Sequence, residues 1–142
     1  MAKYLFLTGI AKWAKVHKPD HEYNFYGLDL YLDKDSMKAF KESGLSLKIR
    51  EGDDGMYIRP RRDPEKLFEG MPEKPKVLIR DGEDEDGKPV YVPFADNIGN
   101  GSFVTCKIEV FDTKRGKGHR LEAVAVENLV PYDGGDNDDL PF

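Results

Sequence analysis

The sequence has only one cysteine, Cys106, among its 142 residues. A lone thiol excludes an internal disulfide framework and a thiolate metal cluster, and it favours a reducing, cytoplasmic setting. No run of 18 apolar residues is present, so no membrane-spanning helix is predicted. Polar Thr8 and Gly9 interrupt the short apolar stretch at residues 4–7, and no small-residue cleavage site follows, so we expect no secretory signal.

Sequence motifs of common enzymes are missing as well. The chain has no GxSxG nucleophile turn, no glycine-rich phosphate loop followed by a lysine, and no cysteine–histidine signature. His17, Asp20 and His21 are possible metal ligands, but they lie in a proline-containing turn without a clear residue to complete the site. We therefore expect a protein that is not an enzyme and that binds no metal and no cofactor.

The acidic residues are unevenly distributed. The net charge is -5, but nine of the 27 acidic residues lie in two short runs, at residues 81–86 and 133–139. The other 18 acidic residues face 22 basic ones, so the rest of the chain is mildly basic. The sequence therefore predicts a polarised molecule in which basic surface is available to an anionic partner.

Short segments of alternating hydrophobicity dominate the pattern. Strands are expected at residues 4–16, 23–32, 45–50, 56–62, 75–80, 89–94, 101–113 and 119–130, with possible bulges at Gly9 and Gly27. One short helix is expected, capped by Asp35 or Ser36 and ending at Gly44. This pattern predicts an all-β domain, best fitted by an OB-fold, which is a five-stranded Greek-key barrel, with extra hairpins and loops. A β-sandwich is the alternative.

The strongest internal signal is a predicted hairpin between residues 45–50 and 56–62. If Ile49 lies opposite Ile58, all aliphatic side chains share one face. The other face then pairs Arg50 with Tyr57, Lys48 with Arg59 and Ser46 with Arg61. Like charges that face each other repel, and a single-stranded nucleic acid would relieve that cost through its phosphates and its flat bases. The alternative is an ordinary solvated strand face.

Other segments repeat this combination of cations and aromatic rings. Trp13 lies between Lys12 and Lys15, three aromatic residues surround the start of the second strand, and residues 114–120 form a basic loop. For each aromatic ring the alternative is a place in the core, and for the basic loop it is a flexible turn. The predicted contacts with single-stranded DNA are Lys12, Trp13, Lys15, Tyr23, Phe25, Lys48, Arg50, Tyr57, Arg59, Arg61, Arg62, Lys107, Lys114 and Arg115.

The last ten residues, DGGDNDDLPF, combine aspartates with an apolar tip and a terminal carboxylate. Two glycines give slack, and self-repulsion of the aspartates keeps such a segment extended and disordered. An acidic, aromatic terminus suits a partner pocket with a basic rim and an apolar hole. We therefore divide the chain into a domain at residues 1–131 and an interaction tail at 132–142. The predicted partner-binding residues are Asp136, Asp138, Asp139, Leu140, Pro141 and Phe142.

The tip DDLPF resembles the acidic terminus of bacterial single-stranded-DNA-binding proteins, which end in aspartates, an aliphatic residue, proline and phenylalanine. The segment NIGNGSFVTCKIEVFDT, with the later HRLEAVAVENLVPYDGG, resembles the C-terminal half of the bacteriophage proteins of this kind. The chain lacks the long Gly/Gln/Pro-rich linker of the bacterial proteins, which favours the phage type.

This resemblance implies an OB-fold that coats single strands in replication, recombination and repair, in the cytoplasm of a bacterial host. It also implies that the tail recruits replication and recombination proteins and competes with DNA for the basic groove. A protein-interaction adaptor without a DNA site of its own is the alternative. The sequence does not determine the oligomeric state, and it does not separate DNA from RNA as the ligand.

Overall fold

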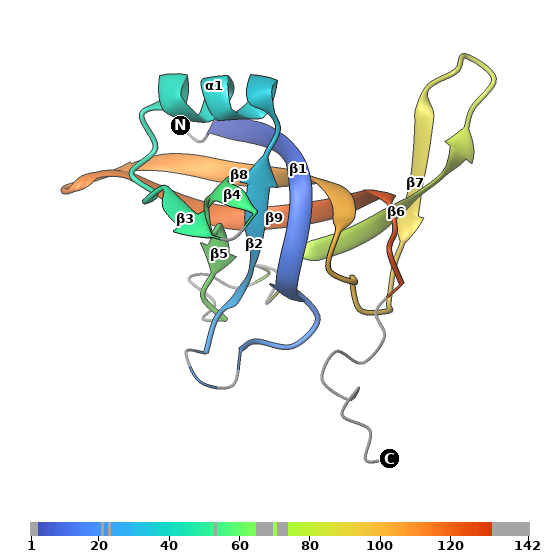
Figure 1. The fold of residues 1–142 in the computed structure, drawn as a ribbon, viewed down its shortest axis with the longest axis horizontal. Coiled ribbons are helices and arrows are strands. Elements are labelled where there is room, and N and C mark those ends of the chain that lie inside the picture. Colours follow the sequence, from blue (N-terminus) through green and yellow to red (C-terminus); the bar gives the residue numbers. More distant parts are fainter. Residues whose placement is uncertain are drawn as a thin grey trace.

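The computed structural model describes residues 3–20, 22, 24–52, 54–64, 70 and 74–131, and they form a mostly β structure with one short helix, as predicted (Figure 1). None of its helices is long and apolar enough to cross a membrane, as far as the described residues go. The elements in chain order are β1 (Lys3–Lys15), β2 (Tyr26–Leu32), α1 (Lys34–Ser43), β3 (Arg50–Gly52), β4 (Gly55–Tyr57), β5 (Arg61–Arg62), β6 (Lys76–Glu83), β7 (Pro89–Pro93), β8 (Ser102–Thr113) and β9 (Gly116–Asn128).

Seven of these strands form one sheet in the order β5-β2-β1-β8-β9-β6-β7. The sheet curls so that its edge strand β5 meets β9. There the backbone N–H of Arg61 donates to Nε2 of His119 over 3.1 Å, and the guanidinium of Arg62 donates to the carbonyl of Leu121 over 3.3 Å. These side-chain bonds close β5, β2, β1, β8 and β9 into a small barrel. This arrangement is the predicted OB-fold.

The strands β6 and β7 form a hairpin outside that barrel, and Figure 1 shows it projecting away from the other strands. It is attached because β6 pairs in parallel with β9, from Lys76 opposite Ala123 to Ile79 opposite Val126. The acidic run at residues 81–86 was predicted as a loop, but β6 continues as far as Glu83. Asp84 then forms the turn, since its carboxylate accepts hydrogen bonds from two backbone N–H groups farther along the chain, at 2.8 and 3.0 Å.

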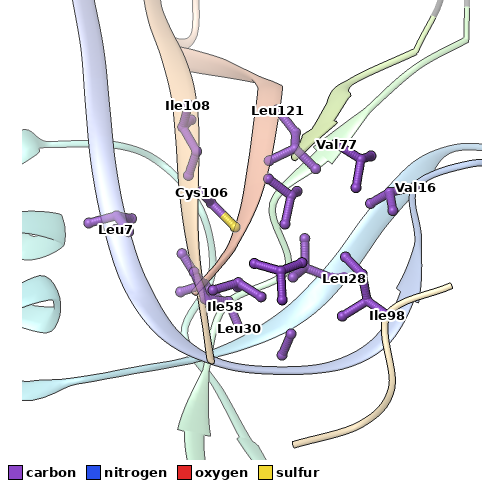
Figure 2. Packing of buried hydrophobic residues seen from close by; sticks show 14 of the residues in the cluster. Leu7, Val16, Leu28, Leu30, Ile58, Val77, Ile98, Cys106, Ile108 and Leu121 are labelled. Carbon is purple, nitrogen blue, oxygen red and sulfur yellow. The ribbon is translucent and has the colours of Figure 1, made fainter. Parts of the chain in front are cut away.

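Alternating residues of the long strands fill the barrel. Along β8, the predicted inward set of Val104, Cys106, Ile108 and Val110 is buried. Figure 2 shows Cys106 and Ile108 among the aliphatic side chains that the other strands contribute. Burial raises the pKa of the Cys106 thiol to about 12, so this cysteine is a core side chain and not a reactive group.

The bend in the first strand lies at Trp13 and not at Gly9, where a bulge was expected. Pairing of β1 with β2 shifts between Lys12 and Lys15, and Trp13 has a left-handed backbone with φ of 53°. Gly9 has another role, because a Cβ there would lie 2.1 Å from the carbonyl oxygen of Tyr31. The strands β1 and β2 approach too closely at this point for any side chain.

The helix begins two residues earlier than the pattern predicted. Asp33 is the N-cap, and its carboxylate accepts a hydrogen bond from the backbone N–H of Ser36 over 2.8 Å. The predicted end at Gly44 is confirmed, since this residue has the left-handed φ of 75°. The Ser36 hydroxyl accepts a bond from the backbone N–H of Thr8 over 2.8 Å, which ties α1 to β1.

Candidate nucleic-acid interface

The predicted hairpin forms, but it is much shorter than expected. Arg50 lies opposite Tyr57 as predicted, and the ladder of β3 and β4 has three residue pairs. Beyond Tyr57 the chain leaves β3 and joins β2, so that Ile58 pairs with Leu30. The prediction that Lys48 and Ser46 pair with Arg59 and Arg61 is therefore wrong. Ile58 is completely buried in the barrel. An isolated two-stranded hairpin has no core that could bury it in this way.

The cations of the predicted hairpin nevertheless converge. A hollow of about 490 Å³ lies between the segment before β3, the start of β2 and the segment that leads into β5. Among the described residues, its lining includes four cations, one aromatic ring and no acidic residue. The residues that line it are Phe25, Ser46, Leu47, Lys48, Arg50, Arg59 and Arg61. The guanidinium of Arg61 lies 5.6 Å from the centre of the Phe25 ring, so the ring and the cation form one composite surface.

Two further hollows continue this one. A hollow of about 180 Å³ shares Phe25 and Arg59 with it and extends to Trp13, Lys15 and Asp20. A third of about 260 Å³ shares Arg61 and is also lined by Arg62, Asp63, Phe111, Gly118, His119 and Arg120. Neighbouring hollows share lining residues and therefore adjoin one another. We call these three hollows together the groove.

An ion pair lies in the middle of the groove. The Arg59 guanidinium donates to the carboxylate of Asp29 over 2.7 Å, with a second contact at 3.5 Å. This hydrogen bond raises the pKa of Arg59, so the guanidinium stays charged. Asp29 is only 7% exposed, whereas about a third of the Arg59 side chain is open to solvent. Asp29 therefore orients Arg59 and offsets part of its charge.

Trp13 is the most exposed large apolar residue at the end of the groove, with 61% of its surface open. Its left-handed backbone is held by a hydrogen bond from its N–H to Oδ1 of Asn100 over 2.8 Å. An L-residue other than glycine pays roughly 1–2 kcal/mol for this conformation. The fold keeps an exposed ring at a strained position, which is typical of a residue with a binding role.

Comparison with known proteins supports the assignment of the fold. No family model matches the sequence, and no curated protein sequence matches it. Among solved structures, the single-stranded DNA-binding protein from bacteriophage Enc34, in a C-terminally truncated form, matches with a TM-score of 0.52. The two chains are 18% identical, and the match covers 91% of this chain and 88% of the phage chain. The chain has the fold of a phage single-stranded-DNA-binding protein.

The position of the groove agrees with how an OB-fold uses its surface. Such barrels bind oligonucleotides across the face of their second and third strands, between the loop after the first strand and the loop between the last two. Here β2 and the segment ending in β5 form that face. Trp13 lies near one end, and the turn between β8 and β9 lies near the other, because Gly116 packs against the hydroxyl of Ser46.

That turn carries two of the predicted contacts, Lys114 and Arg115. Residues 114–120 were expected to form a basic loop, but β8 continues to Thr113 and β9 begins at Gly116. Only two residues remain between the strands, and both are exposed. The two cations are therefore presented by a tight turn beside the hollow that Ser46 lines, and not by a flexible loop.

Other predicted contacts lie outside the groove lining. The Tyr57 ring packs on Tyr31, with centroids 4.9 Å apart, and Lys12 lies 5.3 Å above Tyr31 in an ion pair with Asp54. Tyr57, Tyr31 and Lys12 therefore form a cluster of two rings and one cation beside the groove. The guanidinium of Arg59 lies 6.0 Å from the Tyr57 ring and connects the cluster to the groove.

Two predicted cations occupy unexpected positions. Arg62 lines the groove, but it is only 3% exposed, and its guanidinium donates to the carboxylate of Glu122 over 2.8 Å. This buried pair closes the barrel, so we remove Arg62 from the contact set. Lys107 lies on the outer face of β8, where the barrel separates it from the groove. Tyr23 and the tail residues 132–142 lie outside the described residues.

The sequence prediction missed three lining residues of the third hollow, Phe111, His119 and Arg120. Two of them belong to the basic segment 114–120, which was the signal available. The His119 imidazole is neutral at pH 7, because burial and the charge of Arg61 lower its pKa to about 4. His119 is thus an acceptor for the backbone N–H of Arg61 at neutral pH. It positions β5, and with it the Arg61 side chain.

His17, Asp20 and His21 were weighed as possible metal ligands in the sequence, although no metal was expected. In the structure, Nε2 of His17 lies 2.8 Å from the backbone carbonyl oxygen of Asp96. Within the described part of the chain, no group of three potential ligands is close enough to hold a metal ion. His21, the third residue of that motif, lies outside the described residues.

Proposed function

We propose that this protein binds single-stranded DNA in the groove, without catalysis. The observation that carries the proposal is the convergence of Lys48, Arg50, Arg59 and Arg61 around Phe25 on the binding face of an OB-fold. Cations at such spacing follow a phosphate backbone, and exposed rings such as Phe25 and Trp13 offer stacking surfaces for bases. The phage protein with this fold is a single-stranded DNA-binding protein, which supports the same ligand class.

A charge-matched pair of double variants tests the proposal. Lys48→Ala/Arg50→Ala removes two exposed groove cations, while Lys38→Ala/Lys41→Ala removes two exposed cations from α1. Fluorescence anisotropy with labelled oligo-dT at several salt concentrations gives the affinity and its salt dependence. The groove variant should bind at least about tenfold more weakly, with a log–log salt slope shallower by about 1.4, and the α1 variant should bind like the wild type. Equal behaviour of both variants, or binding independent of salt, contradicts the proposal.

The same titration identifies the preferred nucleic acid. Oligo-dT, oligo-U and duplex DNA are compared under one salt condition. A groove that stacks bases should favour either single strand over the duplex, whose bases are already stacked. A preference for duplex DNA would contradict the proposal, and no binding to any of the three would leave the adaptor alternative in place.

We further propose that residues 1–131 form the binding domain and that the tail at 132–142 recruits proteins of DNA replication, recombination and repair. Support comes from the sequence of the tail, in which Asp138 and Asp139 precede an apolar tip. Deletion of residues 136–142 should leave oligo-dT affinity unchanged or increase it, because negative charge is removed from a DNA-binding protein. Loss of DNA binding on this deletion would contradict the assigned role of the tail.

A further inference from the structure

A fourth hollow, of about 500 Å³, lies on the outer face of β8, β9 and β6, outside the groove. Its lining carries four cations and a single acidic residue. The lining residues are Arg62, Lys74, Pro75, Lys76, Lys107, Glu122 and Ala123. Arg62 and Glu122 form an ion pair of 2.8 Å and offset each other. Among the described residues, the remaining charge of this hollow is carried by Lys74, Lys76 and Lys107, which we call the lysine row.

The sheet register explains why these lysines gather. Ala123 of β9 lies opposite Lys107 of β8 on one side and opposite Lys76 of β6 on the other. Neighbouring strands are about 4.8 Å apart, so the two lysines flank one small residue across three adjacent strands. Alanine leaves the space between them open, and like charges so placed repel each other in the absence of an anion.

Exposed aromatic rings extend the lysine row. In the next strand, Phe6 of β1 lies opposite Lys107, and 58% of its surface is open to solvent. Tyr4 is 49% exposed, and the Lys107 ammonium group lies 4.4 Å from the centre of its ring. The outer face thus repeats the combination of cations and flat rings that characterises the groove.

The outer surface adjoins the groove at Arg62, a buried residue that lies between the two. The fourth hollow shares Arg62 with the third hollow, which contains His119 and Arg120 and which in turn shares Arg61 with the main one. In the third hollow, the Arg120 guanidinium lies 5.2 Å from the centre of the Phe111 ring. Cations and rings therefore recur along a route from Trp13, around the edge at β5 where Arg62 is buried, to Tyr4 and Phe6.

We propose that a longer single strand continues along this route, and that the lysine row with Tyr4 and Phe6 is a second contact segment on the outer face. The inference rests on the proposed function of the groove. A single-stranded nucleic acid fits both parts, since it supplies regularly spaced phosphates for the lysines and bases for the rings. A short oligonucleotide occupies only the groove, whereas a long one reaches the second segment.

The test compares two oligonucleotide lengths, of about 8 nucleotides, which lies within the range of about 4–16 bound by a single OB-fold, and of about 30, which exceeds that range. The variant Lys74→Ala/Lys76→Ala/Lys107→Ala should bind the short oligo-dT within about twofold of the wild type. It should bind the long one at least about tenfold more weakly, with a salt slope shallower by about 2. The control Lys34→Ala/Lys38→Ala/Lys41→Ala removes the same charge from α1 and should change neither affinity.

The outcomes separate this inference from the proposed function. If the wild type binds short oligonucleotides but the lysine variant binds the long one normally, the second segment is refuted and the groove stands. Equal weakening at both lengths also refutes it, because the lysines would then belong to the first segment. If the wild type binds neither length, the function of the groove itself fails.

An acidic peptide is the competing ligand for a basic, aromatic surface. A fluorescent peptide DGGDNDDLPF is titrated onto the wild type and onto the lysine variant. Binding that the variant loses, together with unchanged affinity for the long oligonucleotide, would assign the surface to a protein ligand and overturn the inference. The variant Phe6→Ala provides an independent check, since it should weaken binding of the long oligonucleotide only.

Discussion

Arg59 and Asp29 form a hydrogen-bonded ion pair of 2.7 Å in a groove where cations outnumber acidic residues in the described lining. The pair has two opposite effects on a polyanionic ligand. The carboxylate fixes the guanidinium in place, and it also lowers the positive potential that attracts phosphates. Because Arg59 remains partly exposed, the guanidinium is available to a ligand while it stays bonded to Asp29.

Asp29→Asn should therefore strengthen DNA binding. The amide keeps a hydrogen-bond acceptor for Arg59, and the groove gains one net positive charge. We expect oligo-dT affinity to rise about threefold to tenfold at low salt, with a log–log salt slope steeper by about 0.7. The control Asp35→Asn makes the same charge change in the first turn of α1 and should leave affinity unchanged. Weaker binding by Asp29→Asn would mean that orientation of Arg59 outweighs its charge.

Trp13 should contribute to DNA binding at the expense of stability. Replacing it with glycine removes the exposed ring and relieves the left-handed backbone. Affinity for oligo-dT should fall by about 1–3 kcal/mol, while thermal stability should stay the same or rise by about 1 kcal/mol. Trp13→Phe retains a stacking surface and should lose less affinity. Since Trp13 is the one tryptophan of the chain, saturating oligo-dT should quench the intrinsic tryptophan fluorescence of the wild type, and unchanged fluorescence would argue against stacking.

His119 makes stability depend on pH in a defined window. Its pKa is about 4 in the folded protein against 6.5 in a free side chain, so the unfolded chain binds the extra proton between these values. The contribution is complete above pH 6.5 and is lost as the pH falls toward 4, up to about 3 kcal/mol. Urea unfolding of the wild type and of His119→Gln, at pH 7.5 and 4.5, measures it. The pH-dependent loss should be smaller in the variant, and identical losses would show that His119 does not titrate as described.

Gly9→Ala should destabilise the barrel by about 3 kcal/mol or more, because the new Cβ would meet the backbone of Tyr31 and neither strand can yield. Gly44→Ala is the matched control. There the nearest side-chain atoms would lie 3.9 Å away, so the cost is mainly that of a left-handed backbone, about 1 kcal/mol. Thermal unfolding compares the two variants, and a smaller loss at Gly9 than at Gly44 would contradict the close approach of β1 and β2.

Much of the fold could be predicted because strand periodicity is a local property. The inward set of β8, the short helix ending at Gly44 and the pairing of Arg50 with Tyr57 all follow from residues close together in the sequence. Predictions about contacts between residues far apart in the sequence were less successful. Ile58 pairs with Leu30 and not with Ile49, because a completely buried partner in the barrel stabilises it more than a two-stranded hairpin would.

In the candidate site too, the local pattern predicted some contacts of the cations and missed others. Alternation along the chain identified Lys48, Arg50, Arg59 and Arg61, all of which line the groove. Alternation alone did not separate them from Arg62, which the meeting of β5 with β9 buries in an ion pair with Glu122. Charge is a property of the residue, whereas the partner that offsets it comes from a distant strand.

The sequence by itself determined that the chain is a mostly β domain with a basic, aromatic surface. Side-chain periodicity and composition are local properties that depend only on which residues follow one another. Only the tertiary structure decided where that surface lies. Closure of β5 onto β9 assembles the groove and buries Arg62, and the parallel pairing of β6 with β9 places Lys76 and Lys107 on either side of Ala123. These positions depend on contacts between segments far apart in the chain, and local pattern carries no information on such distances.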